Sequence, residues 1–184
     1  MSSHLAALPL VALLFGPLAD LPRPGPANPV PLVSVRAEIN EFSSRLRTYV
    51  DFCHRYAKPE YQVDCLSERM NFAAASLGNY GWEREVKVAL RASARSLYAV
   101  TTKYRAPGAA PVRIWSPETP IVPSRPIRPV APENVTRAAS AAEAVFATAE
   151  LTLLRSADTS PENALAFAQV AEVLGTAKVL LRAA

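Results

Sequence analysis

The chain has 184 residues, of which 50% are hydrophobic, so it can bury a sizeable core in one domain or two small ones. Glycine is scarce (six residues) and proline abundant (17), which favours helices joined by proline-rich connectors over a sheet. The net charge is +4, yet no face interleaves Lys and Arg with stacking aromatic residues, and we therefore expect no nucleic-acid binding.

The N-terminus carries an uncharged apolar run from Leu5 to Leu18. As a helix this run is too short to span a bilayer, but its length is typical of the hydrophobic region of a secretory signal. We therefore predict a signal peptide over 1–19, a periplasmic or secreted protein, and no transmembrane span. No Lys or Arg precedes the run, and the alternative is an apolar N-terminal helix that packs on the core. The proline-rich residues 20–32 are predicted to form an extended tail, because proline lacks the amide donor that a helix needs.

Residues 33–57 are predicted to form the first helix of the core. Apolar residues recur there at alternating spacings of four and three, which is the period of an amphipathic α-helix. This stripe consists of Val35, Ile39, Phe42, Leu46, Tyr49, Cys53 and Tyr56. After a connector that begins at Pro59, we expect Asp64 to cap a second helix. The expected buried side of that helix contains Leu66, Met70, Ala73 and Leu77.

Gly78-Asn79-Tyr80-Gly81 is predicted to interrupt the second helix, because glycine and asparagine tolerate left-handed backbone conformations. A third helix then reaches 104, either as a separate element or as a kinked continuation. Its apolar face contains Trp82, Val86, Leu90, Ser93, Leu97, Val100 and Tyr104.

Proline occupies every third position from Pro117 to Pro132, inside a connecting segment over 105–132. A polyproline II helix has three residues per turn, so the spacing gathers the prolines on one edge and Ile121, Ile127 and Val130 on another. We favour a strap that returns along the bundle with this apolar edge packed on it, so that the helices before and after it point the same way. Two alternatives remain, a semi-rigid spacer between modules and a proline-motif ligand for another protein.

The C-terminal residues 133–184 are predicted to form an antiparallel helical hairpin. The first helix covers about 133–156, with Val135, Ala138, Ala142, Val145, Ala149 and Leu153 in register. Ser160-Pro161-Glu162 has the composition of a helix start, with Ser160 as the cap, and the second helix continues to about 182. The alanines clustered in 133–156 permit close helix packing, either within the bundle or between two copies of the chain.

Together these elements predict an all-α protein, a four- to five-helix bundle with a polyproline II crossover segment. The N-terminal helices occupy 33–104, the strap or linker 105–132 and the hairpin 133–184.

The two cysteines, Cys53 and Cys65, are expected to form a disulfide in an oxidising compartment. Cys53 lies near the end of the first helix and Cys65 near the start of the second, so a helical hairpin brings both to its closed end. In a reducing compartment they would remain buried free thiols.

Residues suited to catalysis are few. His54 is the one histidine outside the predicted signal peptide, and its spacing from Cys53 and Cys65 matches no usual zinc pattern. The sequence contains no glycine-rich phosphate loop and no Gly-x-Ser-x-Gly motif. We therefore assign no catalytic residue, metal ligand or cofactor.

The stretch VSVRAEINEF at 33–42 resembles the opening helix of the all-helical chorismate mutases. The resemblance covers these residues alone, and it implies that Arg36 binds a substrate carboxylate. Exported, disulfide-containing members of that family exist at about this size. Glu60 to Asp64 stand where the family has a lysine-containing segment, and Trp82-Glu83-Arg84-Glu85 is only loosely similar to its later Arg-Glu pair.

The resulting hypothesis is an exported, non-catalytic accessory, assembly or binding protein whose partner is another envelope protein. The expected interaction residues are Trp115, Ile121, Arg125, Ile127 and Arg128. The alternative is a small-molecule enzyme or ligand-binding bundle similar to chorismate mutase. It requires Arg36, Arg55 and Arg84 to converge on one cavity, because a charged substrate needs several cations in a low-dielectric site.

The N-terminal prediction is checked by mass spectrometry of the protein purified from its native cells. We expect a new N-terminus between about Ala19 and Ala27, because the small residues there suit signal cleavage. Intact Met1 in a cytosolic fraction would contradict export and leave the cysteines without an oxidising compartment.

Overall fold

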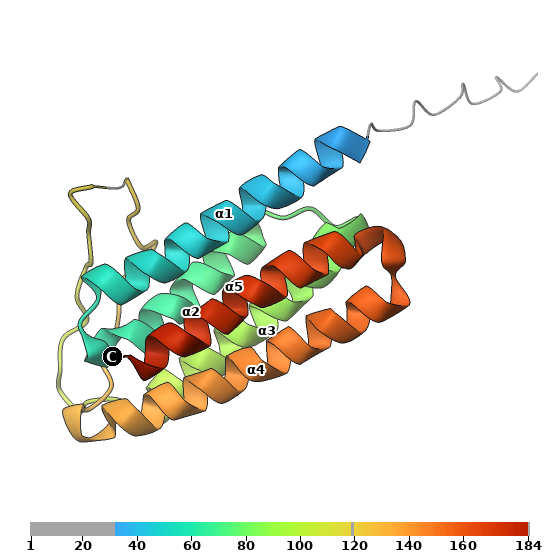
Figure 1. Ribbon diagram of the computed structural model, residues 1–184. Helices are drawn as coiled ribbons and strands as arrows, with labels where there is room; N and C mark the ends of the chain where they lie inside the picture. Colours follow the sequence, from blue (N-terminus) through green and yellow to red (C-terminus); the bar gives the residue numbers. More distant parts are fainter. Residues whose placement is uncertain (1–31, 119, 184) are drawn as a thin grey trace, which may run out of the picture. The chain divides into compact units, whose positions relative to one another are not determined.

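Five α-helices make up the fold of residues 32–118 and 120–183, the part of the chain that the computed structural model describes (Figure 1). Two short 3-10 helices, Pro132–Asn134 and Pro161–Asn163, precede the last two. The five α-helices are α1 Leu32–Tyr56, α2 Pro59–Ala75, α3 Gly81–Lys103, α4 Val135–Thr159 and α5 Ala164–Arg182. The prediction of an all-α bundle is confirmed, whereas the predicted signal peptide and residues 20–31 lie outside the described residues.

Helix α1 follows the predicted stripe closely. Ile39, Phe42, Leu46 and Cys53 are all buried, and Tyr49 and Tyr56 pack partly buried against the same core. The helix already includes Leu32, which the sequence assigned to the tail. An amphipathic stripe therefore fixed both the existence and the buried face of this helix.

Helix α2 begins earlier than predicted, at Pro59. Proline fits the first helical position, because its missing amide has no partner there and its fixed φ suits a helix. Asp64 consequently lies inside the helix, and its predicted role as N-cap is wrong. Every residue from Gln62 to Met70 is buried, since α1, α3, α4 and the connecting segment all contact this helix. Its polar residues must therefore find partners inside the protein.

The glycine turn between α2 and α3 is confirmed. Gly81 has φ +53°, a left-handed conformation that suits glycine. α3 then runs antiparallel to α2, so the alternative of one kinked helix is wrong. The Ser67 hydroxyl of α2 donates to the Ala94 carbonyl of α3 at 2.8 Å, which fixes the two helices against each other.

The connecting segment 105–131 doubles back instead of crossing the bundle, so the predicted strap direction is wrong. Val112 and Ile127 exchange two backbone hydrogen bonds of 2.8 Å each, and the Ala131 amide donates to the Tyr104 carbonyl at 2.8 Å. We call residues 105–118 the outbound limb and 120–131 the return limb. The segment ends where it began, and α4 therefore starts beside the end of α3 and runs antiparallel to it (Figure 1).

The path of this segment depends on the residues between the prolines, because these have a backbone N–H that can donate a hydrogen bond. The threefold proline spacing leaves Ile127 and Val130 with free backbone donors, and these bond to the outbound limb and to the Glu60 carbonyl of α2. Their side chains are buried, with exposed fractions of 0% for Ile127 and 1% for Val130. The apolar edge therefore packs on the bundle, although the segment runs a different course from the predicted one.

Helices α4 and α5 form the predicted antiparallel hairpin. Arg182 pairs with Glu143 at 2.6 Å and Lys178 pairs with Glu150, so the end of α5 lies beside the first half of α4. Ser160 makes no side-chain capping bond, contrary to the prediction. Pro161–Arg182 is the one stretch of the described residues that is long and apolar enough to cross a membrane, but 44% of its most apolar window is buried in the bundle, as in a core helix.

The packing of the return limb is tested by Ile127→Asp. Because Ile127 is fully buried, we expect the free energy of unfolding to fall by about 3 kcal/mol, the cost of an unpaired carboxylate in the core. Urea denaturation measures the change. Val122→Asp is the matched control, since Val122 is 59% exposed on the same limb and should change stability by less than about 0.5 kcal/mol. Equal midpoints for both variants would contradict the packing.

Candidate functional site

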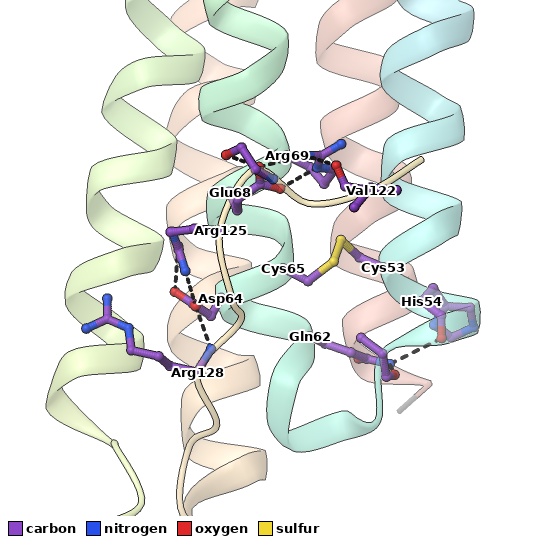
Figure 2. The surroundings of a disulfide bond; sticks show 12 residues. Cys53, His54, Gln62, Asp64, Cys65, Glu68, Arg69, Val122, Arg125 and Arg128 are labelled. Carbon is purple, nitrogen blue, oxygen red and sulfur yellow. Dashed lines mark hydrogen bonds and ion pairs between the residues drawn. A yellow bond between two sulfur atoms is a disulfide. The ribbon is translucent and has the colours of Figure 1, made fainter. Parts of the chain in front are cut away.

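The carboxylate of Asp64 in α2 is fully buried and holds the return limb in place (Figure 2). Arg125 donates to it from both terminal nitrogens, at 2.5 and 2.9 Å, and the Arg128 amide donates at 2.8 Å. A bidentate guanidinium–carboxylate pair is among the strongest side-chain interactions and fixes orientation as well as distance. Arg125, one of the expected interaction residues, therefore holds the return limb on α2, while 34% of its side chain stays exposed.

One turn further along α2, Glu68 and Arg69 form a second buried ion pair. Glu68 also accepts from the Ser124 amide at 2.9 Å and from the Ser124 hydroxyl at 2.8 Å. Arg69 donates to the Val122 carbonyl at 3.4 Å, and its guanidinium lies 4.6 Å from the ring centroid of Phe72. These contacts extend the attachment of the return limb over two turns of α2.

The partners of these buried charges keep them ionised. Burial opposes the ionisation of Glu68, but the hydrogen bonds from Arg69 and Ser124 outweigh it and lower the Glu68 pKa. Burial likewise opposes the charge on Arg125, yet the Asp64 carboxylate raises the pKa of that guanidinium above its ordinary value. Glu68 and Arg125 are therefore held in their charged forms, which is what a structural clamp requires.

The predicted disulfide is confirmed between Cys53 of α1 and Cys65 of α2, with both residues fully buried and their Cα atoms 5.7 Å apart. Figure 2 shows it between α1 and α2, with Asp64 directed to the return limb instead. His54 lies next to it in sequence, and its Nδ1 is buried without a hydrogen-bond partner among the described residues.

The other expected interaction residues differ in how accessible they are. Ile127 is buried and unavailable, and Ile121 is partly buried against the core. The Arg128 guanidinium lies 4.1 Å from the Tyr98 ring centroid on α3 instead of facing open solvent. Trp115 is 67% exposed, and it is the expected residue that remains most accessible.

A separate groove lies between α3 and α4, with a volume of about 640 Å³. We call it the α3/α4 groove. Its lining consists mainly of small side chains, together with Val88, which is 62% exposed. Residues spaced by four form both walls: Val88, Ala92 and Ser96 on α3, and Ala144, Thr148, Thr152 and Ser156 on α4.

The threonines of the groove add apolar surface. Thr148 donates its hydroxyl to the Ala144 carbonyl at 2.9 Å, and Thr152 donates to the Thr148 carbonyl at 2.8 Å. These bonds use the hydroxyl hydrogens within α4, so the groove presents methyl groups and little free hydrogen-bonding capacity. Of the predicted alanine cluster, Ala138 and Ala142 pack in the core, whereas Ala144 lines this groove.

The exposed face of α3 is basic, and one of its arginines, Arg84, lines the groove. Arg84, Arg91 and Arg95 are exposed at spacings of seven and four residues, and none forms an ion pair within the described part of the chain. Glu85 is the acidic residue of the groove lining. The groove therefore combines an apolar floor with one arginine and one glutamate, on a helix that carries two more unpaired arginines.

The cation cluster required by the chorismate mutase resemblance is not formed by the described residues. Arg36, Arg55 and Arg84 are all exposed, and Arg84 alone lines the α3/α4 groove, while the other two belong to α1. Within the described ranges, no group of three or more His, Cys, Asp or Glu residues could hold a metal ion.

Two features were not recognised in the sequence. The spacing of Asp64 and Glu68 places two carboxylates on one face of a helix among buried positions, which indicates cationic partners elsewhere. The four-residue repeat of small side chains from Ala144 to Ser156 indicates a helix surface that allows close approach. Both patterns can be seen in the sequence, but neither indicates which residues or which helix would contact it.

Comparisons of the chain with protein-family models, with curated proteins and with solved structures find no match. The surfaces described above are therefore interpreted from their own geometry and charge.

The buried carboxylate of Glu68 should make stability depend on acid. Its pKa is below the ordinary 4.5 in the folded protein, so the unfolded chain takes up the proton first as the pH falls. The free energy of unfolding should therefore be retained above pH 4.5 and decrease as the pH falls toward the folded pKa. Urea titrations between about pH 5 and pH 3 measure this slope.

Glu68→Gln should flatten that acid slope, although it lowers stability at every pH because Arg69 loses its buried partner. Glu41→Gln, which removes an exposed carboxylate of α1, is the control and should retain the slope. An unchanged slope in Glu68→Gln would show that Glu68 does not carry this acid dependence.

Proposed function

We propose that this protein is an exported, non-catalytic binding protein whose α3/α4 groove holds an amphipathic helix of another envelope protein. The observation that carries the proposal is the combination of an apolar groove of about 640 Å³ with Arg84 in its lining and two further exposed arginines, Arg91 and Arg95, on the same helix. Helix-in-groove recognition uses a partner's apolar stripe in this way.

The dimensions and walls of the groove favour a helix as its occupant. Two antiparallel helices with small residues at four-residue spacing leave a straight channel between their ridges, and a third helix can place its own ridge there. The lining of α4 extends from Ala144 to Ser156, which corresponds to about 18 Å of helix at 1.5 Å per residue. That length matches three turns of a docked helix.

Charge indicates which helices would be preferred. Arg84, Arg91 and Arg95 have no acidic partner among the described residues, so a docked helix with Asp or Glu beside its apolar stripe would supply the missing charges. Such rim pairs contribute mostly to the association rate and to specificity. Binding should accordingly weaken as the ionic strength rises.

The compartment in the proposal is supported by the disulfide and by the N-terminal apolar run. Disulfides persist in oxidising compartments and are rare in reducing ones. The Cys53–Cys65 bond links α1 to the helix that carries the return limb, so an exported protein would gain stability from it.

Site-specific photocrosslinking tests the occupant. A photoreactive residue at Ala92, on the groove wall, is irradiated in the native envelope fraction, and the crosslinked peptides are sequenced by mass spectrometry. We expect peptides from an amphipathic helix with acidic flanks in another envelope protein. Crosslinks to a second copy of this chain, or to lipid alone, would overturn the assignment of the occupant.

Filling the groove provides the matched comparison. Thr148→Phe, with the photoreactive residue kept at position 92, should reduce the crosslink at least about tenfold, because a bulky ring occupies the space of the partner's side chains. Ala168→Phe adds the same ring at an exposed position of α5 and should leave the crosslink unchanged. An equal effect of both variants would contradict docking in the groove.

A further inference from the structure

A second cavity, of about 280 Å³, lies where α2, α3 and the return limb meet. It is separate from the α3/α4 groove, and its charged lining residues are Glu68, Arg95 and Arg125. Asn71, Tyr98 and the serines Ser67 and Ser124 complete the polar part of the lining. We propose that this cavity, the oxyanion site, binds a compact organic anion through a phosphate or carboxylate group.

The acidic residue of the cavity has no capacity left for a ligand. Glu68 Oε1 accepts from Arg69 at 2.6 Å, from the Ser124 amide at 2.9 Å and from the Ser124 hydroxyl at 2.8 Å. Its other oxygen accepts from Arg69 Nε. A cationic ligand would have to displace these buried bonds, so the carboxylate does not make the cavity a cation site.

The unused hydrogen-bonding groups of the cavity are donors. Arg125 is engaged by Asp64 through both terminal nitrogens, whereas Arg95 forms no ion pair with any described residue. A guanidinium carries five N–H donors and no acceptor, and the side-chain amide of Asn71, an exposed residue of the lining, adds two more. Together these groups match the oxygens of an anion.

The local charge favours the same ligand. Asp64 and Glu68 are matched by Arg125 and Arg69, so Arg95 and Arg128 remain as uncompensated positive charges around Tyr98. Arg128 lies over the Tyr98 ring at 4.1 Å, and Tyr98 lines the cavity. The edge of the cavity therefore carries positive charge that no acidic group of the fold neutralises.

The cavity volume restricts the ligand to a small molecule. About 280 Å³ lies at or below the lower end of the range of small-molecule sites, so a phosphate or carboxylate with a few attached carbon atoms would fill it. The clamp residues Asp64 and Arg125 fix the return limb that forms one wall, so this wall exists before a ligand arrives.

Isothermal titration calorimetry of the purified protein, without any partner protein, tests the oxyanion site with inorganic phosphate and with citrate at constant ionic strength. We expect saturable binding of at least one of the two. Phosphate alone would assign a phosphate-bearing ligand, and citrate alone a carboxylate-bearing one. Binding of neither anion overturns the proposal.

Arg95→Gln should weaken binding at least about tenfold, since it removes the charged donor. Arg91→Gln is the matched control, because it removes the same charge one turn away on α3 and its side chain does not line the cavity. The affinity of the Arg91→Gln variant for the anion should stay within about twofold of that of the original protein. Asn71→Ala should weaken binding about fivefold, which is less than the loss expected for Arg95→Gln. Equal losses in Arg95→Gln and Arg91→Gln would indicate diffuse attraction and overturn the site. Thermal unfolding of each variant verifies that it folds.

Discussion

The buried carboxylate of Asp64 is the constraint on which the arrangement of the connecting segment depends. A fully buried charge on α2 is costly unless it is paired, and its three hydrogen-bond donors all come from the return limb: two side-chain nitrogens of Arg125 and the backbone amide of Arg128. The limb cannot move away without leaving that charge unmatched. The cavity lined by Arg95 depends on this attachment, because Ser124 and Arg125 of the return limb form one of its walls.

Helices α1, α3 and α4 could be predicted from the sequence because each has one apolar stripe. The stripe of α1 and the register of the C-terminal hairpin needed nothing beyond local period, and the turn at Gly78–Gly81 needed only its composition. Helix α2 was harder, since residues 62–70 are buried on every side and no stripe marks its start. The sequence therefore favours a connector over 59–63 and a cap at Asp64, where the structure has the first turns of the helix.

The path of the proline segment could not be predicted, because the threefold spacing determines which residues share an edge but not where the chain turns. The reversal depends on pairing between Val112 and Ile127, fifteen positions apart, and the outbound limb bends before it at Gly108, which has φ +76°. The destination of Arg125 was missed for a related reason. Its partner, Asp64, precedes it by 61 residues, and the sequence around either residue does not indicate the other.

The hydrogen bond between the Ala131 amide and the Tyr104 carbonyl closes the connecting segment into a loop whose two ends coincide. In topological terms the segment is an insertion: α3 and α4 would remain antiparallel neighbours if a tight turn joined residues 104 and 131. Connectivity alone therefore does not account for the 26 residues between those positions. Loops of this length without regular structure are uncommon in compact domains and usually have a function. The length of this segment should therefore be maintained by what its surface does, and not by the need to connect α3 to α4.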